Sequence, residues 1–186
     1  MRVEMISSER SQNVIVSIVI IAAVLSSVLL VGNAQYYSGS YVLVERMEVS
    51  IVQVVVSDID PSNESIYPHL SFTFNFRTDS PSQGNVRLTS IDASATLNDD
   101  LLSLTTFDKS LTNDPDGFLH PGYNTNFTLA KTINAHTDRA TILHAYNIST
   151  WNWYLRFRYN ILLFDEGQSS RTLYFNWTGP TEVIRI

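Results

Sequence analysis

The sequence contains no cysteine, only two lysines and little charge of either sign. The absence of cysteine excludes a disulfide framework, a thiolate metal site and a cysteine nucleophile. Charged residues make up 16% of the 186 residues, below the roughly 25% of an average soluble domain. The formal net charge is −6, and a chain so poor in lysine lacks the basic clusters that bind phosphate backbones. We therefore expect no nucleic-acid partner, and either a membrane segment or a strand-rich domain full of hydroxyl side chains.

The longest apolar run lies near the N-terminus. No charged residue occurs between Ser11 and Val44, and residues 14–31 are apolar except for three serines. As a helix, this run is about 27 Å long, close to the roughly 30 Å hydrocarbon core of a bilayer. Each serine hydroxyl is expected to bond back to a carbonyl of its own helix, at little cost. We predict an uncleaved transmembrane signal-anchor helix at residues 13–34, with the lipid bilayer as its partner.

Two alternatives remain for this run. A cleaved signal peptide would use Gly32-Asn33-Ala34 as its cleavage site, but the run exceeds the 7–15 apolar residues of such peptides, and the positive and negative charges before it balance. A pilin-type helix would pack into a filament core. Processing of pilins usually leaves Gly or Ala just before the helix, and residues 8–12 offer neither.

The flanking charges indicate how the helix is oriented. Arg2 and Arg10 precede it and only Arg46 follows closely, which favours an N-terminus on the cytoplasmic side. We predict residues 1–12 to be a cytoplasmic tail, residues 35–41 a juxtamembrane linker and residues 42–186 an extracytoplasmic domain. The linker holds three tyrosines, a residue type that suits the headgroup layer.

Alternating apolar and polar residues predict strands after the linker. The clearest are Leu70–Arg77 and Trp151–Leu163, and a turn at 165–168 leads from the second into a strand at 172–177, forming a hairpin. Weaker patterns predict strands at 42–56, 86–97, 101–107 and 124–131.

Details of these patterns predict the fold class. In 86–97 the apolar phase shifts by one after Leu88, as a β-bulge would produce. Turn-forming residues cluster at 60–63, 79–84 and 113–117, and the one candidate helix, 137–146, is too short to predict. We predict an all-β fold: an antiparallel, immunoglobulin- or fibronectin-III-like β-sandwich preceded by one transmembrane α-helix.

Residues 45–178 resemble the late-embryogenesis-abundant type 2 domain, also called the water stress and hypersensitive response domain. The resemblance rests on the strand Leu70–Arg77, the segments Ile91–Asp99 and Gly117–Thr125, and the hairpin Trp153–Trp177. The Asn-Pro-Asn turn of that family is replaced here by Thr78-Asp79-Ser80-Pro81. The resemblance implies a fibronectin-III-like fold and a non-enzymatic, often membrane-tethered protein, and it carries over no catalytic residues.

The sequence shows no pattern typical of a catalytic, cofactor or metal site. The histidines, at positions 69, 120, 136 and 144, lack zinc-ligand spacing. With Gly117 as the sixth residue of a calcium loop, the first and twelfth would be Thr112 and Tyr123, neither of which is acidic. No Gly-x-Ser-x-Gly elbow or glycine-rich phosphate loop occurs. We expect a protein that is not an enzyme and needs no cofactor. A weaker alternative is a cation site made by four aspartates, Asp58, Asp60, Asp99 and Asp100.

Two further patterns concern the surface. Arg156 and Arg158 share one face of a strand; we expect a solvent face paired with acidic neighbours, with an anion- or partner-binding stripe as the alternative. Four Asn-x-Ser/Thr sequons predict N-glycosylation, which favours an extracytoplasmic domain. Their asparagines are Asn63, Asn126, Asn147 and Asn176.

Together these features predict a single-pass, membrane-anchored and non-catalytic β-sandwich on the extracellular or lumenal side. Its expected role is structural or protein-binding, with a protein partner in or near the same membrane. Three alternatives remain. They are an accessory subunit that binds through Trp151, Trp153 and Trp177, a pilin-like filament subunit, and a sandwich that binds a lipid or small ligand.

Overall fold

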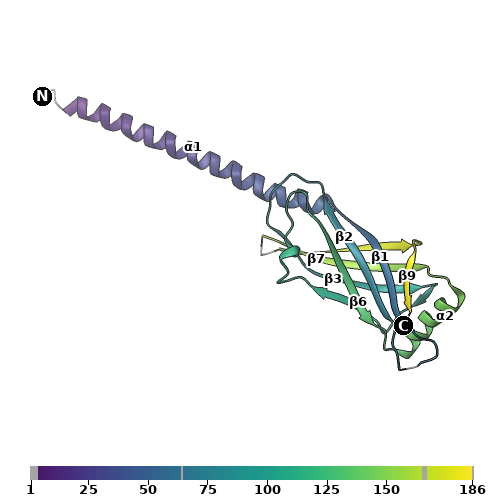
Figure 1. Cartoon of the computed structure of the whole chain (residues 1–186). Coiled ribbons are helices and arrows are strands. Elements are labelled where there is room, and N and C mark those ends of the chain that lie inside the picture. The colour runs from purple at the N-terminus through teal and green to yellow at the C-terminus, as the bar shows by residue number, and fades with distance from the viewer. Residues whose placement is uncertain (1–3, 64, 165–166, 186) are drawn as a thin grey trace.

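The computed structural model describes residues 4–63, 65–164 and 167–185. A long N-terminal helix, α1 (Glu4–Glu45), extends away from a body made of two β-sheets (Figure 1). Among the described residues, one helix, within Glu9–Glu45, is long and apolar enough to cross a membrane, and the large apolar side chains of residues 14–31 are exposed. Ser17 and Ser27 donate hydrogen bonds to carbonyls one turn earlier, as expected.

The body consists of two sheets. The first has the strand order β6-β2-β1-β9, and the second has the order β4-β3-β7-β8 with β5 also paired to β3. All strand pairs are antiparallel except β1 with β9, which is parallel. A helix followed by a sandwich-like arrangement of sheets is therefore confirmed, but one strand pair departs from the expected antiparallel pattern. The strands are β1 (Met47–Ile59), β2 (His69–Thr78), β3 (Val86–Leu97), β4 (Asp100–Leu101), β5 (Phe107–Ser110), β6 (Asn124–Thr132), β7 (Trp153–Leu163), β8 (Gly167–Trp177) and β9 (Thr181–Arg185).

Aromatic rings fill the space between the sheets. The apolar positions that alternate along β2 are fully buried and face those of β7. Phe74 stacks on Phe157 with ring centroids 4.2 Å apart, and Phe76 meets Tyr159 edge to face at 5.7 Å. Such pairs add to the stabilisation that burial of apolar area provides. The period of two therefore marks which side of each strand faces the core.

The structure differs from the sequence prediction at residues 35–45. These residues continue α1 without a break, so the segment predicted as a linker is helical and the first strand begins at Met47 instead of residue 42. The physical reason is tertiary, because Leu43 and Val44 at the end of α1 are buried in the core. The cytoplasmic tail predicted at 1–12 is helical from Glu4 onward, and residues 1–3 lie outside the described residues.

A second difference lies in the middle of the chain. The candidate helix forms as α2 (His136–Ile148), while the strand predicted at 101–107 is replaced by the short β4, a loop and β5. A 3-10 turn, η1 (Pro115–Gly117), occupies the turn cluster at 113–117. The predicted bulge is confirmed by the shift in register between Leu88 and Ser90. The β7–β8 hairpin is confirmed too, although residues 165–166 of its turn lie outside the described residues.

Candidate functional site

The junction between α1 and the sandwich is a close-packed contact between small residues. A Cβ on Gly84 would lie 2.3 Å from the Ser40 hydroxyl, and a Cβ on Gly39 would lie 2.1 Å from the carbonyl oxygen of Gln83. Ser40 is fully buried; its hydroxyl accepts a hydrogen bond from the Asn85 N–H and donates one to the Tyr36 carbonyl oxygen. The two glycines therefore let the helix and the loop before β3 approach closely.

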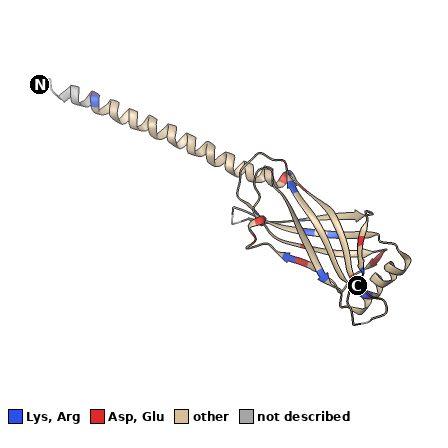
Figure 2. Cartoon of the chain, viewed as in Figure 1, with Lys and Arg blue, Asp and Glu red and all other residues tan. Residues whose placement is uncertain are grey.

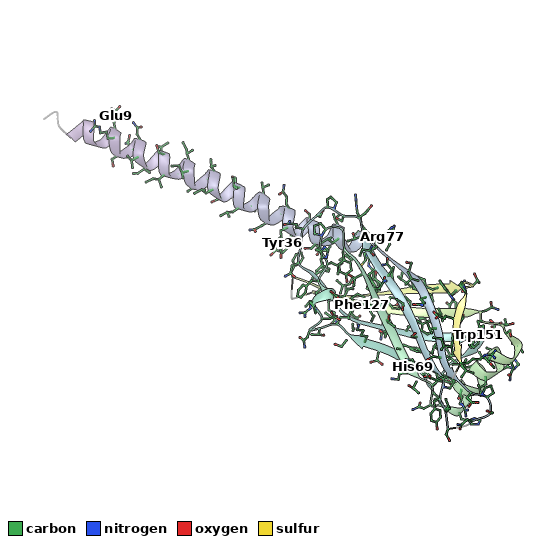
Figure 3. The ribbon with its side chains drawn as sticks, in the orientation of Figure 1. Glu9, Tyr36, His69, Arg77, Phe127 and Trp151 are labelled. Atoms are coloured by element: carbon green, nitrogen blue, oxygen red, sulfur yellow. The ribbon has the colours of Figure 1, made fainter. Side chains whose placement is uncertain are left out.

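Four aromatic side chains cluster beside this junction, and we call Tyr36, Tyr37, Tyr41 and Phe164 the aromatic collar. The Phe164 ring contacts all three tyrosines, with centroids 4.5 Å from Tyr37, 6.2 Å from Tyr41 and 6.3 Å from Tyr36. Tyr37 and Tyr41 are 53% and 59% exposed. The collar brings α1 together with the end of β7, and the label of Tyr36 marks its place between helix and body in Figure 3.

Phe164 is held in an unusual backbone conformation. Its φ of 55° lies in the left-handed region, which a bulky side chain rarely adopts. Its N–H donates to the carbonyl oxygen of Asn85, the residue whose own N–H donates to Ser40. The ring is therefore fixed against the tyrosines by the same loop that holds α1.

Charged residues begin immediately beyond the collar. Arg171 pairs with Glu45 at 2.6 Å and Arg77 pairs with Glu48 at 2.6 Å. In Figure 2 the long stretch of α1 after its first turns carries no charged colour until its junction with the body. From residue 14 toward the body, α1 is therefore first apolar, then aromatic at the collar, and charged residues follow from Glu45 onward.

The predicted glycosylation residues are spread over four parts of the sandwich, and all four asparagines are exposed. Asn63 lies in the loop after β1, Asn126 on β6, Asn147 in the last turn of α2 and Asn176 on β8. The Asn126 side-chain oxygen accepts a hydrogen bond from the Asn75 amide. Glycosylation at these positions stays a prediction.

The arginine stripe on β7 lies on the outer face of the second sheet. The Arg158 guanidinium pairs with the Asp92 carboxylate across to β3, at 2.9 Å. Arg156 lies beside this pair in a shallow groove that Ser94 and Thr106 also line. The pairing of Arg158 fits the solvent-face interpretation.

Within the described residues, no three His, Asp or Glu side chains gather closely enough to hold a metal ion. His69 lies within 3.3 Å of the Thr132 hydroxyl, and the His120 ring packs edge to face on Tyr123. One of the four aspartates considered as a cation site is Asp60. The Asp60 carboxylate accepts hydrogen bonds from the Ser62 hydroxyl and N–H, and these bonds lower the pKa of the Asp60 carboxyl.

The aromatic face proposed as an interface is largely part of the core. Trp153 is only 2% exposed and donates its ring N–H to the Thr181 hydroxyl, while Trp151 and Trp177 are half-buried and pack against the core. Tyr154 and Tyr174 form an exposed aromatic pair on the outer face of the second sheet, stacked with ring centroids 6.0 Å apart.

Sequence reasoning missed two buried polar groups. Asp138 in the first turn of α2 is 1% exposed and accepts hydrogen bonds from the Leu104 N–H and the Thr105 hydroxyl. Tyr123 donates its hydroxyl to the Asp116 carbonyl oxygen, and burial raises its pKa to about 12. No local pattern marks either residue, because their partners are placed beside them only by folding.

Comparisons with known proteins identify no family for this chain. No family model matches the chain, and no curated protein matches its sequence. Solved structures that align with 72% of the chain include a Northeast Structural Genomics Consortium target (8% identity, 84% of that chain, TM-score 0.41). They also include a protein from Archaeoglobus fulgidus (7% identity, 97% of that chain, TM-score 0.37) and a β-glucuronidase from Bacteroides uniformis (15% identity, 13% of that chain, TM-score 0.28).

Proposed function

We propose that this chain is a single-pass membrane protein whose non-catalytic β-sandwich is held on the extracytoplasmic side as a structural or protein-binding module. One observation carries the proposal: the apolar helix and the sandwich form one continuous, tightly packed unit. Leu43 and Val44 of α1 are buried in the sandwich core, while residues 14–31 of the same helix are exposed and apolar. An exposed apolar surface of this size calls for a lipid or protein partner.

The way α1 is attached sharpens this proposal. A flexible linker would let the sandwich sample many orientations around its anchor, whereas a helix that continues into the core restricts it to few. We infer that the module presents fixed faces to partners in the same membrane. Such tethering raises the effective concentration of the sandwich for those partners.

Two measurements on native membranes that contain the full chain test the proposal. Alkaline carbonate extraction shows whether the chain is integral to the membrane, and the intact mass of the purified protein shows whether residues 1–34 are kept. We expect the chain to stay with the membrane pellet and to keep residues 1–34. Protease added to sealed vesicles or cells should digest the sandwich from the extracytoplasmic side. Release of a chain that begins after Ala34 would instead mark α1 as a cleaved signal, and a protected sandwich would reverse the orientation.

A finer assignment of the fold is also a proposal. We propose an immunoglobulin- or fibronectin-III-like sandwich of the late-embryogenesis-abundant type 2 kind. The bond from the Tyr123 hydroxyl back to the Asp116 carbonyl, at the entrance to β6, supports it, since immunoglobulin-like domains use a comparable tyrosine. An experimental structure whose strand order cannot be superposed on that class would exclude it.

An accessory-subunit role is the second candidate, and the exposed Tyr154–Tyr174 pair favours it. Tyr174 is 61% exposed on β8, an edge strand of the second sheet. Tyrosine is enriched at protein interfaces, and an unpaired strand edge is a site where another chain can add a strand. Stoichiometric co-purification in mild detergent, lost in a Tyr174→Ala variant but kept in an Arg156→Ala variant, would support this candidate.

A further inference from the structure

The position of the aromatic collar along α1 sets its depth relative to the apolar run. A helix rises 1.5 Å per residue, so Tyr36 and Tyr37 lie about 7.5 to 9 Å beyond Val31, the last residue of that run. The polar layer on each side of the hydrocarbon core is roughly 5–8 Å thick. If residues 14–31, about 27 Å long, are centred in a hydrocarbon core of roughly 30 Å, Tyr36 and Tyr37 lie about 6 and 7.5 Å outside the core, at headgroup depth, and Tyr41 lies further out.

The end of β7 reaches the same depth from the sandwich side. The Phe164 ring lies 4.5 Å from the Tyr37 ring, and a surface groove between β8 and α1 is lined by Tyr37, Tyr41, Phe164 and Ser169. The left-handed backbone of Phe164 turns this ring toward the helix rather than into the core. Strained conformations of this kind concentrate at positions that serve a function.

The chemistry around the collar also suits a headgroup layer. No charged residue occurs from Ser11 to Val44, so α1 itself carries no charge beside the tyrosines, while two carboxylates, Asp165 and Glu166, follow Phe164 in the sequence and suit the headgroup layer better than the hydrocarbon core. Aromatic side chains with an apolar body and a polar tip concentrate at this boundary in membrane proteins. The ion pair of Glu45 with Arg171 begins on the aqueous side of the collar.

We propose that the aromatic collar seats the sandwich directly on the phospholipid headgroup layer of the bilayer that α1 spans, with Phe164 as a membrane contact separate from the helix. The inference rests on the proposed function, because it needs α1 to be membrane-spanning. It goes beyond that function by assigning a second membrane-binding element, contributed by the β7–β8 hairpin. The sandwich is then held by two contacts, which fixes its tilt as well as its distance from the membrane.

The absence of cysteine makes a direct test simple, since one introduced cysteine can be labelled without background. Two matched variants of the full chain are needed. Ser169→Cys places the label beside the collar, and Ser103→Cys places it at the opposite end of the sandwich, in the loop that binds α2. Both serines are exposed. Each variant carries a fluorophore and is reconstituted into phosphatidylcholine vesicles containing phosphatidylcholine spin-labelled on its headgroup.

We expect the label at position 169 to be quenched several-fold more strongly than the label at 103. Carbonate extraction of the same vesicles reports insertion independently. If the chain stays inserted and position 169 is quenched no more than position 103, the collar does not touch the headgroups, and the inference fails while the proposed function stands. If carbonate extracts the chain, the proposed function fails and this inference with it.

A second pair of variants tests Phe164 itself. In the Ser169→Cys background, Phe164→Ala should lower quenching markedly while the chain remains inserted. Tyr154→Ala, which removes an exposed ring from the far half of β7, should leave quenching unchanged. Equal quenching in the Phe164→Ala and parent chains would overturn the role of this residue as a membrane contact.

Discussion

At one end of the sandwich α1 is held by close packing of small residues, and at the other end α2 is held by a buried carboxylate. Figure 1 places the two helices at opposite ends of the body. Around Ser40, Gly39 and Gly84 let α1 and the loop before β3 approach closely, and the Ser40 hydroxyl accepts a hydrogen bond from the Asn85 N–H. Around Asp138 they are side-chain hydrogen bonds to a loop, from Leu104 and Thr105.

The difference between the ends reflects what each helix has to do. A close-packed joint between small residues restricts the movement of the long helix α1 relative to the sandwich. A buried carboxylate that accepts two hydrogen bonds fixes a short helix on a loop. Arg139 adds a bond from its guanidinium to the Asn63 carbonyl oxygen, so α2 also holds the loop after β1.

Gly84→Val should have the largest effect. The new side chain would collide with Ser40, whose Cα would lie only 2.6 Å from the added Cβ, and overpacking of this kind costs about 3 kcal/mol. We expect a lower midpoint of guanidinium unfolding, followed by tryptophan fluorescence of the full chain in detergent, and faster proteolysis between residues 32 and 46. Gly32→Ala is the control, since nothing lies near its Cβ. Equal behaviour of the two variants would contradict close packing at the junction.

Asp138→Ala should lower the free energy of unfolding by about 2 kcal/mol, because it removes the acceptor of the buried Thr105 hydroxyl and of the Leu104 N–H. Hydrogen exchange should speed up in α2 and in the loop at 102–105, while α1 keeps its protection. Loss of protection at both ends together would show that the two attachments act as one cooperative unit. Asp138→Asn, which keeps one oxygen acceptor, should recover part of the stability.

Tyr123→Phe should cost about 1 kcal/mol at neutral pH, the value of one buried hydrogen bond. Burial raises the pKa of Tyr123 to about 12, above the ordinary value of 10. A raised pKa means that the folded state favours the protonated phenol, so its contribution is complete below pH 10 and is lost as pH rises toward 12. The variant should therefore lose stability less steeply over that range. Burial also raises the pKa of Tyr159, so part of the slope should remain.

Arg158→Ala should have the smallest effect, about 0.5 kcal/mol or less, because its pair with Asp92 is substantially exposed. Added salt should remove even this difference, since exposed ion pairs are screened. A loss of unfolding free energy comparable to that of Asp138→Ala would mean that the Arg158–Asp92 pair stabilises the sandwich as strongly as a buried interaction. Unfolding measured at low and high ionic strength separates these outcomes.

Much of the fold could be predicted because its signals are local. The alternation in Leu70–Arg77 and Trp153–Leu163 marks strands whose apolar sides face each other, and the phase shift after Leu88 marks a bulge. The candidate site was harder to predict. Phe164 and Tyr37 are far apart in sequence, and the three tyrosines of residues 35–41 are equally compatible with a juxtamembrane linker and with a helix.

The parts that sequence reasoning missed depend on contacts between distant residues. Helix α2 has no side-chain cap at its N-terminus, so little in its own sequence distinguishes it from a loop. Burial of Ile142 and Ala145 and the hydrogen bonds to Asp138 stabilise it through contacts with the rest of the sandwich. The same holds for β9, a five-residue strand whose parallel pairing with β1 no local pattern indicates.

The long apolar helix, the strand-rich body and the core-facing side of each strand can be predicted from the sequence, since they follow from residue type at short, regular spacing. The folded chain alone shows that the helix enters the sandwich without a linker and that Gly39 and Gly84 lie against their neighbours. It also shows that Phe164 completes an aromatic collar with tyrosines more than a hundred residues away. Periodicity reports which face of an element is buried, but not what covers it; that depends on which backbones can approach each other closely in the folded chain.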